Sequence, residues 1–297
     1  MPTLNKPMHR QMRFAALLLV LPTLAYANAD SGLTYGSGPD DFRSYAFKAN
    51  VDLTKTVEFN LDYFFAKATG VANTREVGAG LTWYATELVS GNYRHSVTND
   101  GTFEVKGNEG GLSFALDTLW QGELRTTLDL GYGAFKYKAA NPQTIAASNF
   151  ALTQNRSTIG LSQDIVSSFT VYVSHDQYKY DKNLDASILL PLLRNRPLLI
   201  SRTLALLAFP DKTNMLGMTW KTTDALSLDL SLAKTTTLLE QEQKSTKLSV
   251  DFQIGNNLSI VAAVTRVNNS AILGPLGGTI QPATQDTYSE FSVGWGF

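Results

Sequence analysis

The chain lacks cysteine altogether and contains only three histidines among its 297 residues. Without cysteine there can be no disulfide bond, no thiolate zinc site and no lipid-modified amino-terminal cysteine. A glycine-rich phosphate loop, a metal-ligand cluster and a nucleotide-binding motif are also missing from the sequence. The sequence therefore predicts no cofactor and no metal.

Clustered positive charge is missing as well. The formal net charge is −1, and it becomes about −4 when the first 29 residues, which hold three basic and no acidic residues, are set aside. Proteins that bind nucleic acid need clusters of positive charge to meet the phosphates. We therefore expect no nucleic-acid partner.

The first 29 residues have the three-part plan of a secretory signal peptide. A basic front at positions 6, 10 and 13 is followed by the apolar run 14–21 and by small residues up to Ala29. Cleavage after Ala27 or after Ala29 fits this plan equally well. A retained anchor is less favoured, because the apolar run is much shorter than the roughly 20 residues that a spanning helix needs.

Long apolar runs are absent from the remaining sequence. Hydrophobic residues make up 43% of the chain and the mean hydropathy is −0.09, as in a soluble protein. A helical membrane protein would show long apolar spans, whereas a transmembrane β-barrel places apolar side chains at every second position and keeps a moderate average. The periodicity of the sequence therefore decides between these classes.

Apolar and polar residues alternate through many segments. In 57–65 the odd positions are all apolar or aromatic, and in 226–232 every even position is leucine while serine and aspartate lie between. Segment 248–254 repeats the pattern. Successive side chains of a strand point to opposite faces, so the sequence predicts strands with one apolar and one polar face.

Short and long links alternate between these segments, as in outer-membrane barrels, whose short turns are periplasmic. The expected fold is all-β: a closed antiparallel transmembrane β-barrel of about 14 strands, formed as one domain by residues 30–297 after a signal peptide of residues 1–29. Strand counts of 12 or 16 are alternatives, and the first segment is short and weak. The expected strands are 31–37, 42–53, 57–67, 75–84, 88–98, 110–119, 123–137, 155–164, 168–180, 212–221, 225–236, 245–254, 258–267 and 287–297.

Aromatic residues predict two rims. Tryptophan prefers the membrane–water interface, and four tryptophans lie close to a short link or to the end of the chain: Trp83, Trp120, Trp220 and Trp295. A second belt is expected from tyrosines near the opposite strand ends: Tyr45, Tyr63, Tyr132, Tyr137 and Tyr178. A soluble β-sandwich or jelly roll would also alternate, but it requires neither rims nor strands of about ten residues.

The last segment carries a resemblance to a known class of proteins. Phe291, Val293, Trp295 and Phe297 alternate with serine and glycine. This pattern resembles the carboxyl-terminal strand of bacterial outer-membrane β-barrel proteins of the porin-like class, although it indicates no specific family. The resemblance implies that these four residues form the signal recognised by the barrel-insertion machinery, and that the protein resides in the outer membrane of a Gram-negative bacterium.

If the apolar positions face lipid, the other positions line the lumen. Acidic residues outnumber basic ones there by roughly two to one, and charge of one sign in a low-dielectric pore concentrates ions of the opposite sign. The sequence predicts a mild preference for cations, although each charge could also serve only to pair with another and fill the barrel. The candidates are Lys48, Asp52, Glu58, Asp62, Glu76, Arg94, Asp117, Arg125, Asp129, Asp229, Lys247 and Asp251.

Segment 185–210 differs from an ordinary surface loop. It is rich in leucine, but Pro191, Pro197 and three arginines interrupt it, which excludes a spanning helix. One hypothesis is a link that folds into or over the mouth of the barrel and narrows it. The other is an outward link that rests against lipopolysaccharide or a partner. The arginines that would face lumen acids in the first arrangement are Arg194, Arg196 and Arg202.

Two histidines outside the signal peptide precede residues that could assist hydrolysis. They form the pairs His95-Ser96 and His175-Asp176. Adjacent strand residues point to opposite faces, so neither pair is placed for proton transfer, which needs heavy atoms within about 3 Å. We therefore expect no catalytic residue, and an outer-membrane lipid hydrolase is the least favoured function.

The favoured function is an outer-membrane channel for passive diffusion of small solutes that are polar or weakly cationic. The alternatives are a transporter for apolar small molecules, which the leucine-rich segment favours, and a closed barrel that serves as an adhesin or structural anchor. Expected partners are outer-membrane lipid, lipopolysaccharide and the insertion machinery. The sequence leaves the oligomeric state open, and its length is compatible with a monomer.

Overall fold

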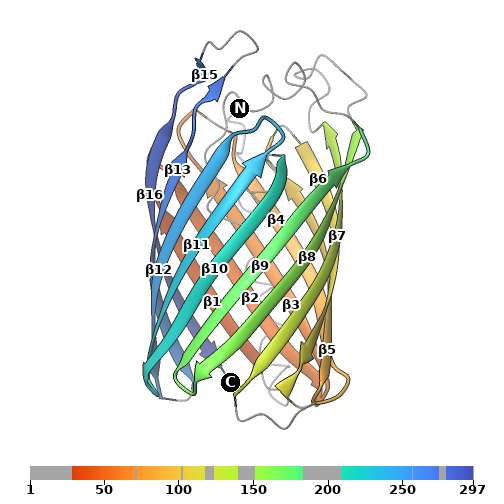
Figure 1. Ribbon diagram of the computed structural model, residues 1–297, viewed down its shortest axis with the longest axis vertical. Coiled ribbons are helices and arrows are strands. Elements are labelled where there is room, and N and C mark those ends of the chain that lie inside the picture. The colour runs from red at the N-terminus through yellow and green to blue at the C-terminus, as the bar shows by residue number, and fades with distance from the viewer. Residues whose placement is uncertain are drawn as a thin grey trace, which may run out of the picture.

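The structure is a computed structural model that describes residues 29–70, 72–101, 103–117, 124–139, 151–182, 209–255, 257–273 and 279–296. Fourteen strands form a closed antiparallel barrel in which neighbours in the chain are neighbours in the wall, and they cross its long axis at a tilt (Figure 1). The predicted fold class and strand number are confirmed. Among the described residues, no helix has the length and hydrophobicity of a membrane span.

The barrel strands follow the alternating segments of the sequence. Their bounds are β1 (Ala29–Ser37), β2 (Arg43–Thr54), β3 (Val57–Lys67), β4 (Thr74–Tyr84), β5 (Val89–Asn99), β6 (Phe103–Ala115), β7 (Thr126–Ala139), β8 (Ala151–Val166), β9 (Phe169–Tyr180), β10 (Pro210–Thr223), β11 (Leu226–Thr237), β12 (Glu242–Ile254), β13 (Leu258–Asn269) and β16 (Thr284–Gly296). A separate hairpin, which the sequence did not reveal, consists of β14 (Ile272–Leu273) and β15 (Thr279–Gln281).

The barrel closes between its first and last strands. β1 pairs with β16 from Asp30 opposite Gly296 to Ser37 opposite Ser289, and with β2 on its other edge. On the inner side of this seam, the hydroxyl groups of Thr34 and Ser292 are hydrogen-bonded at 2.8 Å. A backbone amide without a partner is costly in hydrocarbon, so the short first strand is held by complete pairing on both edges.

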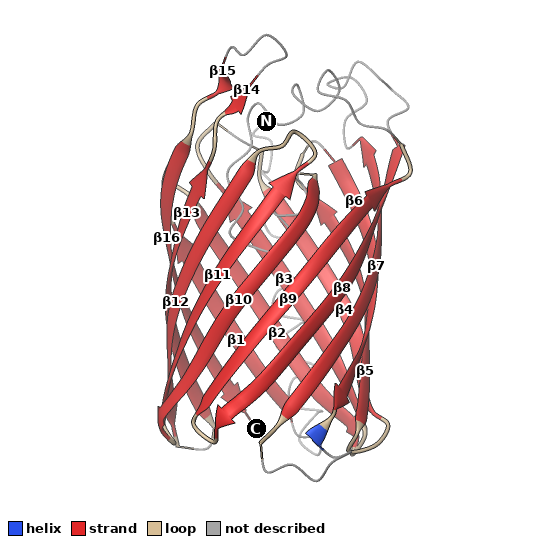
Figure 2. Cartoon of the chain, viewed as in Figure 1, coloured by secondary structure: helices blue, strands red, loops and turns tan. Residues whose placement is uncertain are grey.

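The two ends of the barrel differ in the length of their links. At the short-turn end, β2–β3, β8–β9, β10–β11 and β12–β13 are joined by only a few residues, and at the long-loop end the β9–β10 and β13–β16 links are much longer. Figure 2 shows both ends, with the β14–β15 hairpin projecting beyond the long-loop end.

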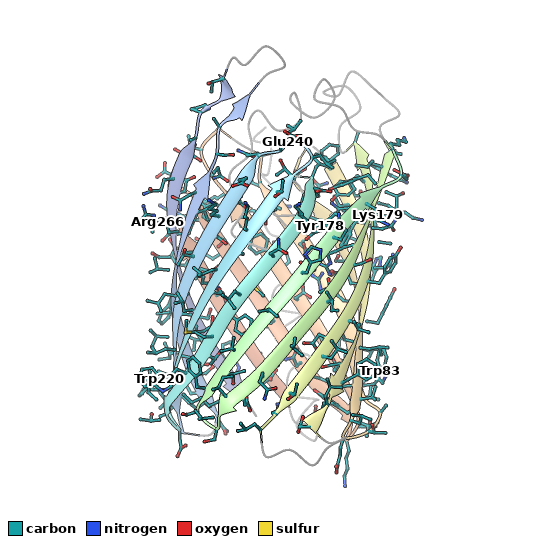
Figure 3. All side chains as sticks on the ribbon, in the orientation of Figure 1. Trp83, Tyr178, Lys179, Trp220, Glu240 and Arg266 are labelled. Carbon is teal, nitrogen blue, oxygen red and sulfur yellow. The ribbon has the colours of Figure 1, made fainter. Side chains whose placement is uncertain are left out.

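The aromatic rims agree with the expectation near the short-turn end and only in part at the other end. Trp83 and Trp220 lie on the outer surface near the short-turn end (Figure 3), and Trp295 is the second-last residue of β16. Trp120 lies outside the described residues. In the second belt, Tyr137 and Tyr178 were wrongly predicted: both are buried inside the barrel, whereas Tyr45 and Tyr132 are exposed outside. The two buried tyrosines occupy strand positions whose side chains face the inside of the barrel.

The outer surface carries a continuous apolar belt, and its exposure to water would be unfavourable. Large hydrophobic side chains are exposed on every side of the wall, and extended apolar patches of this kind are typical of membrane contact. This surface excludes the soluble sandwich, whose apolar face would be internal. Representative exposed residues are Leu33, Val77, Leu112, Leu130, Ile159, Val173, Leu216, Leu232, Leu248, Phe252, Val264 and Phe291.

β6 and β8 begin several residues earlier than the sequence predicts. β6 begins at Phe103 rather than at 110, and β8 begins at Ala151 rather than at 155. At these ends the polarity is inverted, because Phe103 and Leu152 are buried inside while Lys106 is exposed outside. The alternation of outward apolar and inward polar residues therefore does not mark the first residues of β6 and β8.

We predict that charge at the centre of the apolar belt destabilises the barrel strongly. Val250 is exposed on the outer face of β12, and Ser249 beside it faces the lumen. Replacing Val250 with Arg should lower the free energy of unfolding in lipid vesicles by about 2–4 kcal/mol, as measured by guanidinium titration. Ser249→Arg is the matched control and should cost much less. Equal losses in the two variants would contradict the assigned faces.

Candidate functional site in the barrel lumen

Most of the predicted lumen residues lie on strand positions that face the inside. The inward set comprises Lys48, Asp52, Glu58, Asp62, Glu76, Arg94, Asp129, Asp229, Lys247 and Asp251, each flanked by outward residues of the opposite parity. Asp117 and Arg125 instead lie in the β6–β7 link, because β6 ends at Ala115 and β7 begins at Thr126. There the carboxylate of Asp117 accepts a hydrogen bond from the Thr126 amide at 3.2 Å.

An arginine-centred ion network occupies one side of the lumen. Nε and Nη2 of Arg94 donate to the two carboxylate oxygens of Asp62 at 2.9 and 2.6 Å, and Nη1 donates to Glu109 at 3.2 Å. Arg94 also forms an ion pair with Glu76, whose other oxygen accepts a hydrogen bond from Thr98 at 2.9 Å. Because charge-assisted bonds of this kind are strong and directional, the network ties β3, β4, β5 and β6 together on their inner side.

The network continues to β8 through a second arginine. Arg156 pairs with Glu109, and its guanidinium carbon lies 5.7 Å from the centre of the Phe135 ring. Arg156 and Glu109 are each less than 9% exposed. Buried charges are costly unless they are paired, so each arginine here compensates the charge of the carboxylates around it.

Glycine makes room for these long side chains. Gly78 lies between Asp62 and Ser96 in the strand register, and a Cβ atom there would come within 2.5 Å of both the Arg94 guanidinium and the Asp62 carboxylate. Gly133 occupies the same kind of position between Glu109 and Arg156. Glycine at these inward positions therefore leaves gaps in the inner wall.

Two members of the network, Glu109 and Arg156, were not predicted from the sequence. Glu109 fell just outside the expected strand 110–119, and Arg156 was not selected although the alternation of β8 places it opposite in parity to Ile159. The parity rule alone would have identified Arg156. Its contact with Glu109 requires the register of three strands, which a single sequence does not reveal.

Two other lumen carboxylates are bonded to neutral donors. Asp129 accepts a hydrogen bond from Ser113 at 2.6 Å, and Asp229 accepts bonds from Tyr172 and Thr219 at 3.0 and 2.9 Å. Oδ1 of Asp251 is buried and has no hydrogen-bond partner among the described residues. Lys247 pairs with Glu290 at 2.9 Å.

Within the described ranges, no three acidic or histidine side chains are grouped to hold a metal ion.

An apolar cluster fills the inner side of the wall at the long-loop end. We call it the inner apolar cluster. Phe209, the residue before β10, is fully buried in it, with ring centres 5.7 Å from Tyr137 and 6.1 Å from Phe103. The cluster consists of Phe42, Ala66, Phe103, Val105, Phe135, Tyr137, Leu152, Tyr178, Phe209, Val267 and Tyr288.

The lumen groups are ordered along the barrel axis. On β6, Phe103 and Val105 of the inner apolar cluster precede Glu109, and on β8 Leu152 precedes Arg156. The ion network therefore lies below the apolar cluster, and Asp129 lies closer to the short-turn end of β7. The constriction candidates Arg194, Arg196 and Arg202 lie outside the described residues.

The histidine pairs are not arranged for catalysis. Nδ1 of His95 lies 3.0 Å from the amide oxygen of Asn108, and Nδ1 of His175 lies 2.7 Å from that of Asn214. These histidines share the outward parity, whereas the neighbouring Ser96 and Asp176 point inward. As predicted, the two residues of each pair lie on opposite faces of the wall.

Solved structures of outer-membrane channels share this architecture. The CymD monoaromatic hydrocarbon channel superimposes with a TM-score of 0.53 at 8% identity, covering 91% of this chain and 88% of its own. The chain has a porin-like fold. OccK3 (OpdO) of Pseudomonas aeruginosa superimposes with a TM-score of 0.48 at 8% identity, covering 91% of this chain and 95% of its own. An anion-selective porin of Comamonas acidovorans gives a TM-score of 0.45 at 10% identity, covering 91% of this chain and 98% of its own. No family model and no curated protein matches the sequence.

We predict that a methyl group at Gly78 disrupts the ion network. The Cβ atom of Gly78→Ala would overlap Arg94 and Asp62, and overpacking of this kind costs about 1–3 kcal/mol. Gly110→Ala is the matched control, since its Cβ would meet only the Asn92 carbonyl at 3.5 Å. Unfolding free energies of the two variants in detergent or lipid test this, and a Gly78→Ala barrel as stable as the Gly110→Ala barrel would contradict the geometry.

Proposed function

We propose that the protein is an outer-membrane channel through which small solutes diffuse passively. The observation that carries this proposal is that Lys48 and Asp129 face the inside of the barrel and are nevertheless exposed. Space large enough for solvent therefore adjoins the inner wall at these positions. A water-filled, charged lumen inside an apolar shell is the arrangement of diffusion channels.

The outer membrane is the location that the surface supports best. Phe291 and Val293 lie on β16, at positions of the lipid-facing parity, and Trp295 follows them with the same parity. We propose these residues, together with Phe297, as the signal for the insertion machinery. Phe297 lies outside the described residues.

A mild preference for cations follows from the carboxylates that lack a basic partner. Asp129, Asp229 and Asp251 form no ion pair with any described residue, and neutral donors satisfy the first two. Their charge remains available to a passing solute, and low-dielectric walls strengthen its field. The Arg94 network contributes less, because its carboxylates and guanidinium groups largely neutralise each other.

The β9–β10 link is proposed to narrow the mouth. Its described end, Phe209, packs inside the barrel against Phe103 and Tyr137. The contact supports an inward path for the link and with it a role for Arg194, Arg196 and Arg202 beside the lumen acids.

A transporter for apolar small molecules is the second candidate. It is favoured by the inner apolar cluster, which makes the inner side of the wall apolar at the long-loop end. The CymD channel is described as taking monoaromatic hydrocarbons, but at 8% identity that likeness extends to the fold alone. Liposome-swelling and uptake assays with charged and apolar solutes of equal size separate the two candidates.

Conductance in planar bilayers is the experiment that tests the channel proposal. Purified protein should open stable, ohmic steps and should shift the reversal potential in a salt gradient toward cation selectivity. A protein that inserts but never conducts would instead be the closed adhesive or structural barrel.

We predict that two lumen carboxylates set the ion preference. Neutralising both in Asp229→Asn with Asp251→Asn should lower the cation-to-anion permeability ratio, because the field in the lumen weakens. Asp224→Asn in the exposed β10–β11 turn is the matched control and should leave the ratio unchanged. Reversal potentials measured in a salt gradient give the ratio, and an unchanged ratio in the double variant would contradict the assignment.

We also predict that the β9–β10 link limits conductance. Removing residues 187–208 should raise the single-channel conductance, because the mouth loses its narrowest part. Removal of residues 274–278 from the β13–β16 link serves as the control for shortening a link at the same end. Unchanged conductance after the first deletion would eliminate the constriction.

A further inference from the structure

Basic residues gather on the outer surface at the long-loop end. They are exposed and occupy outward positions at the edge of the apolar belt, where Figure 3 shows Lys179 and Arg266 as examples. Only Glu104 and Glu242 among the described acids share these outward strand positions. The set is Arg43, Lys67, Arg75, Lys106, Lys136, Lys138, Lys179, Lys212, Lys234, Lys244 and Arg266.

Three pairs of these cations stand directly opposite each other in the sheet. The register places Arg43 opposite Lys67, Lys106 opposite Lys136, and Lys234 opposite Lys244. Like charges directly opposite each other on neighbouring strands destabilise a sheet. Such pairs are tolerated when an anion lies between them, so each pair needs either an acidic side chain of the protein or an anionic ligand beside it.

The pair Arg43–Lys67 is the least compensated. Glu242 forms ion pairs with both Lys234 and Lys244, and Glu104 lies 3.5 Å from Lys106. By contrast, Arg43 and Lys67 form no ion pair with any described residue.

A third cation lies diagonally across β3 and β4. Arg75 is opposite Phe65, two positions along from Lys67, and its guanidinium carbon lies 5.8 Å from the Phe65 ring centre. Phe65 itself packs against Tyr45, which is exposed on the outer face. Arg43, Lys67 and Arg75, which we call the basic triad, therefore lie at the upper edge of the aromatic part of the belt.

We propose that the basic triad binds phosphate groups in the headgroup of an outer-leaflet lipid, with the acyl chains lying on the apolar belt beneath it. Arginine and lysine donors match phosphate oxygens, and adjacent Tyr45 and Phe65 give the chains an apolar surface. A soluble anion would use only the cations. The inference goes beyond the proposed function, because it concerns the outer surface and holds whether or not the lumen conducts.

The test measures binding of lipid A to the folded protein in zwitterionic detergent. Lipid A with both phosphates should bind and raise the midpoint of thermal unfolding, whereas dephosphorylated lipid A should bind much more weakly. The Arg43→Gln, Lys67→Gln double variant should lose affinity by about tenfold or more, since each lost contact is charge-assisted. Lys55→Gln, in the turn at the opposite end of the same hairpin, is the matched control.

Three results would overturn the proposal. They are equal binding of dephosphorylated lipid A, unchanged affinity in the double variant, and stabilisation by inorganic phosphate alone as large as that by lipid A. The conservative exchange Lys67→Arg keeps the charge and should retain binding, which separates loss of the site from loss of the fold.

Discussion

The barrel depends on the pairing of every strand edge. In hydrocarbon an unpaired amide has no water to replace its partner, so the sheet must close on itself, and it does so between β1 and β16. Once the ring is closed, each strand has one face toward lipid and one toward the lumen. Most of the charged residues on the strands are placed according to that division.

The division also explains how charge is distributed over the wall. Carboxylates cluster inside, where arginine or hydroxyl groups meet them, while lysines and arginines gather outside at the long-loop end. Gly78 contributes to this arrangement, because the absence of a side chain there lets Arg94 and Asp62 meet across the intervening strand β4. Charge pairing in the lumen thus depends on the register of three adjacent strands and not on the sequence of one strand.

Most of the strand order could be predicted from the sequence. The alternation in segments such as 57–65 and 226–232 depends only on neighbouring residues, and the closing strand was evident from Phe291 to Phe297. The same rule failed where polarity is inverted: Tyr137 and Phe103 belong to the inner apolar cluster, although they were expected in an outer belt or outside a strand. The β14–β15 hairpin had no alternating pattern long enough to be seen.

The candidate site was less accessible to prediction. Inward residues such as Asp62, Glu76 and Arg94 follow from parity, but their meeting requires the register that places Gly78 between Asp62 and Ser96. Glu109 was lost through a misplaced strand limit. The opposed cations of the basic triad likewise become visible only when β2 and β3 are aligned, since Arg43 and Lys67 are far apart in the sequence.

The central claim is that alternate residues of each strand face water inside and lipid outside. The absence of cysteine from the chain allows this to be measured directly. Single cysteines would be placed in turn at 228, 229, 230 and 231 of β11 and exposed to a water-soluble thiol reagent after insertion into vesicles. The account predicts that 229 and 231 react while 228 and 230 do not. Uniform reactivity, or the reverse alternation, would contradict it.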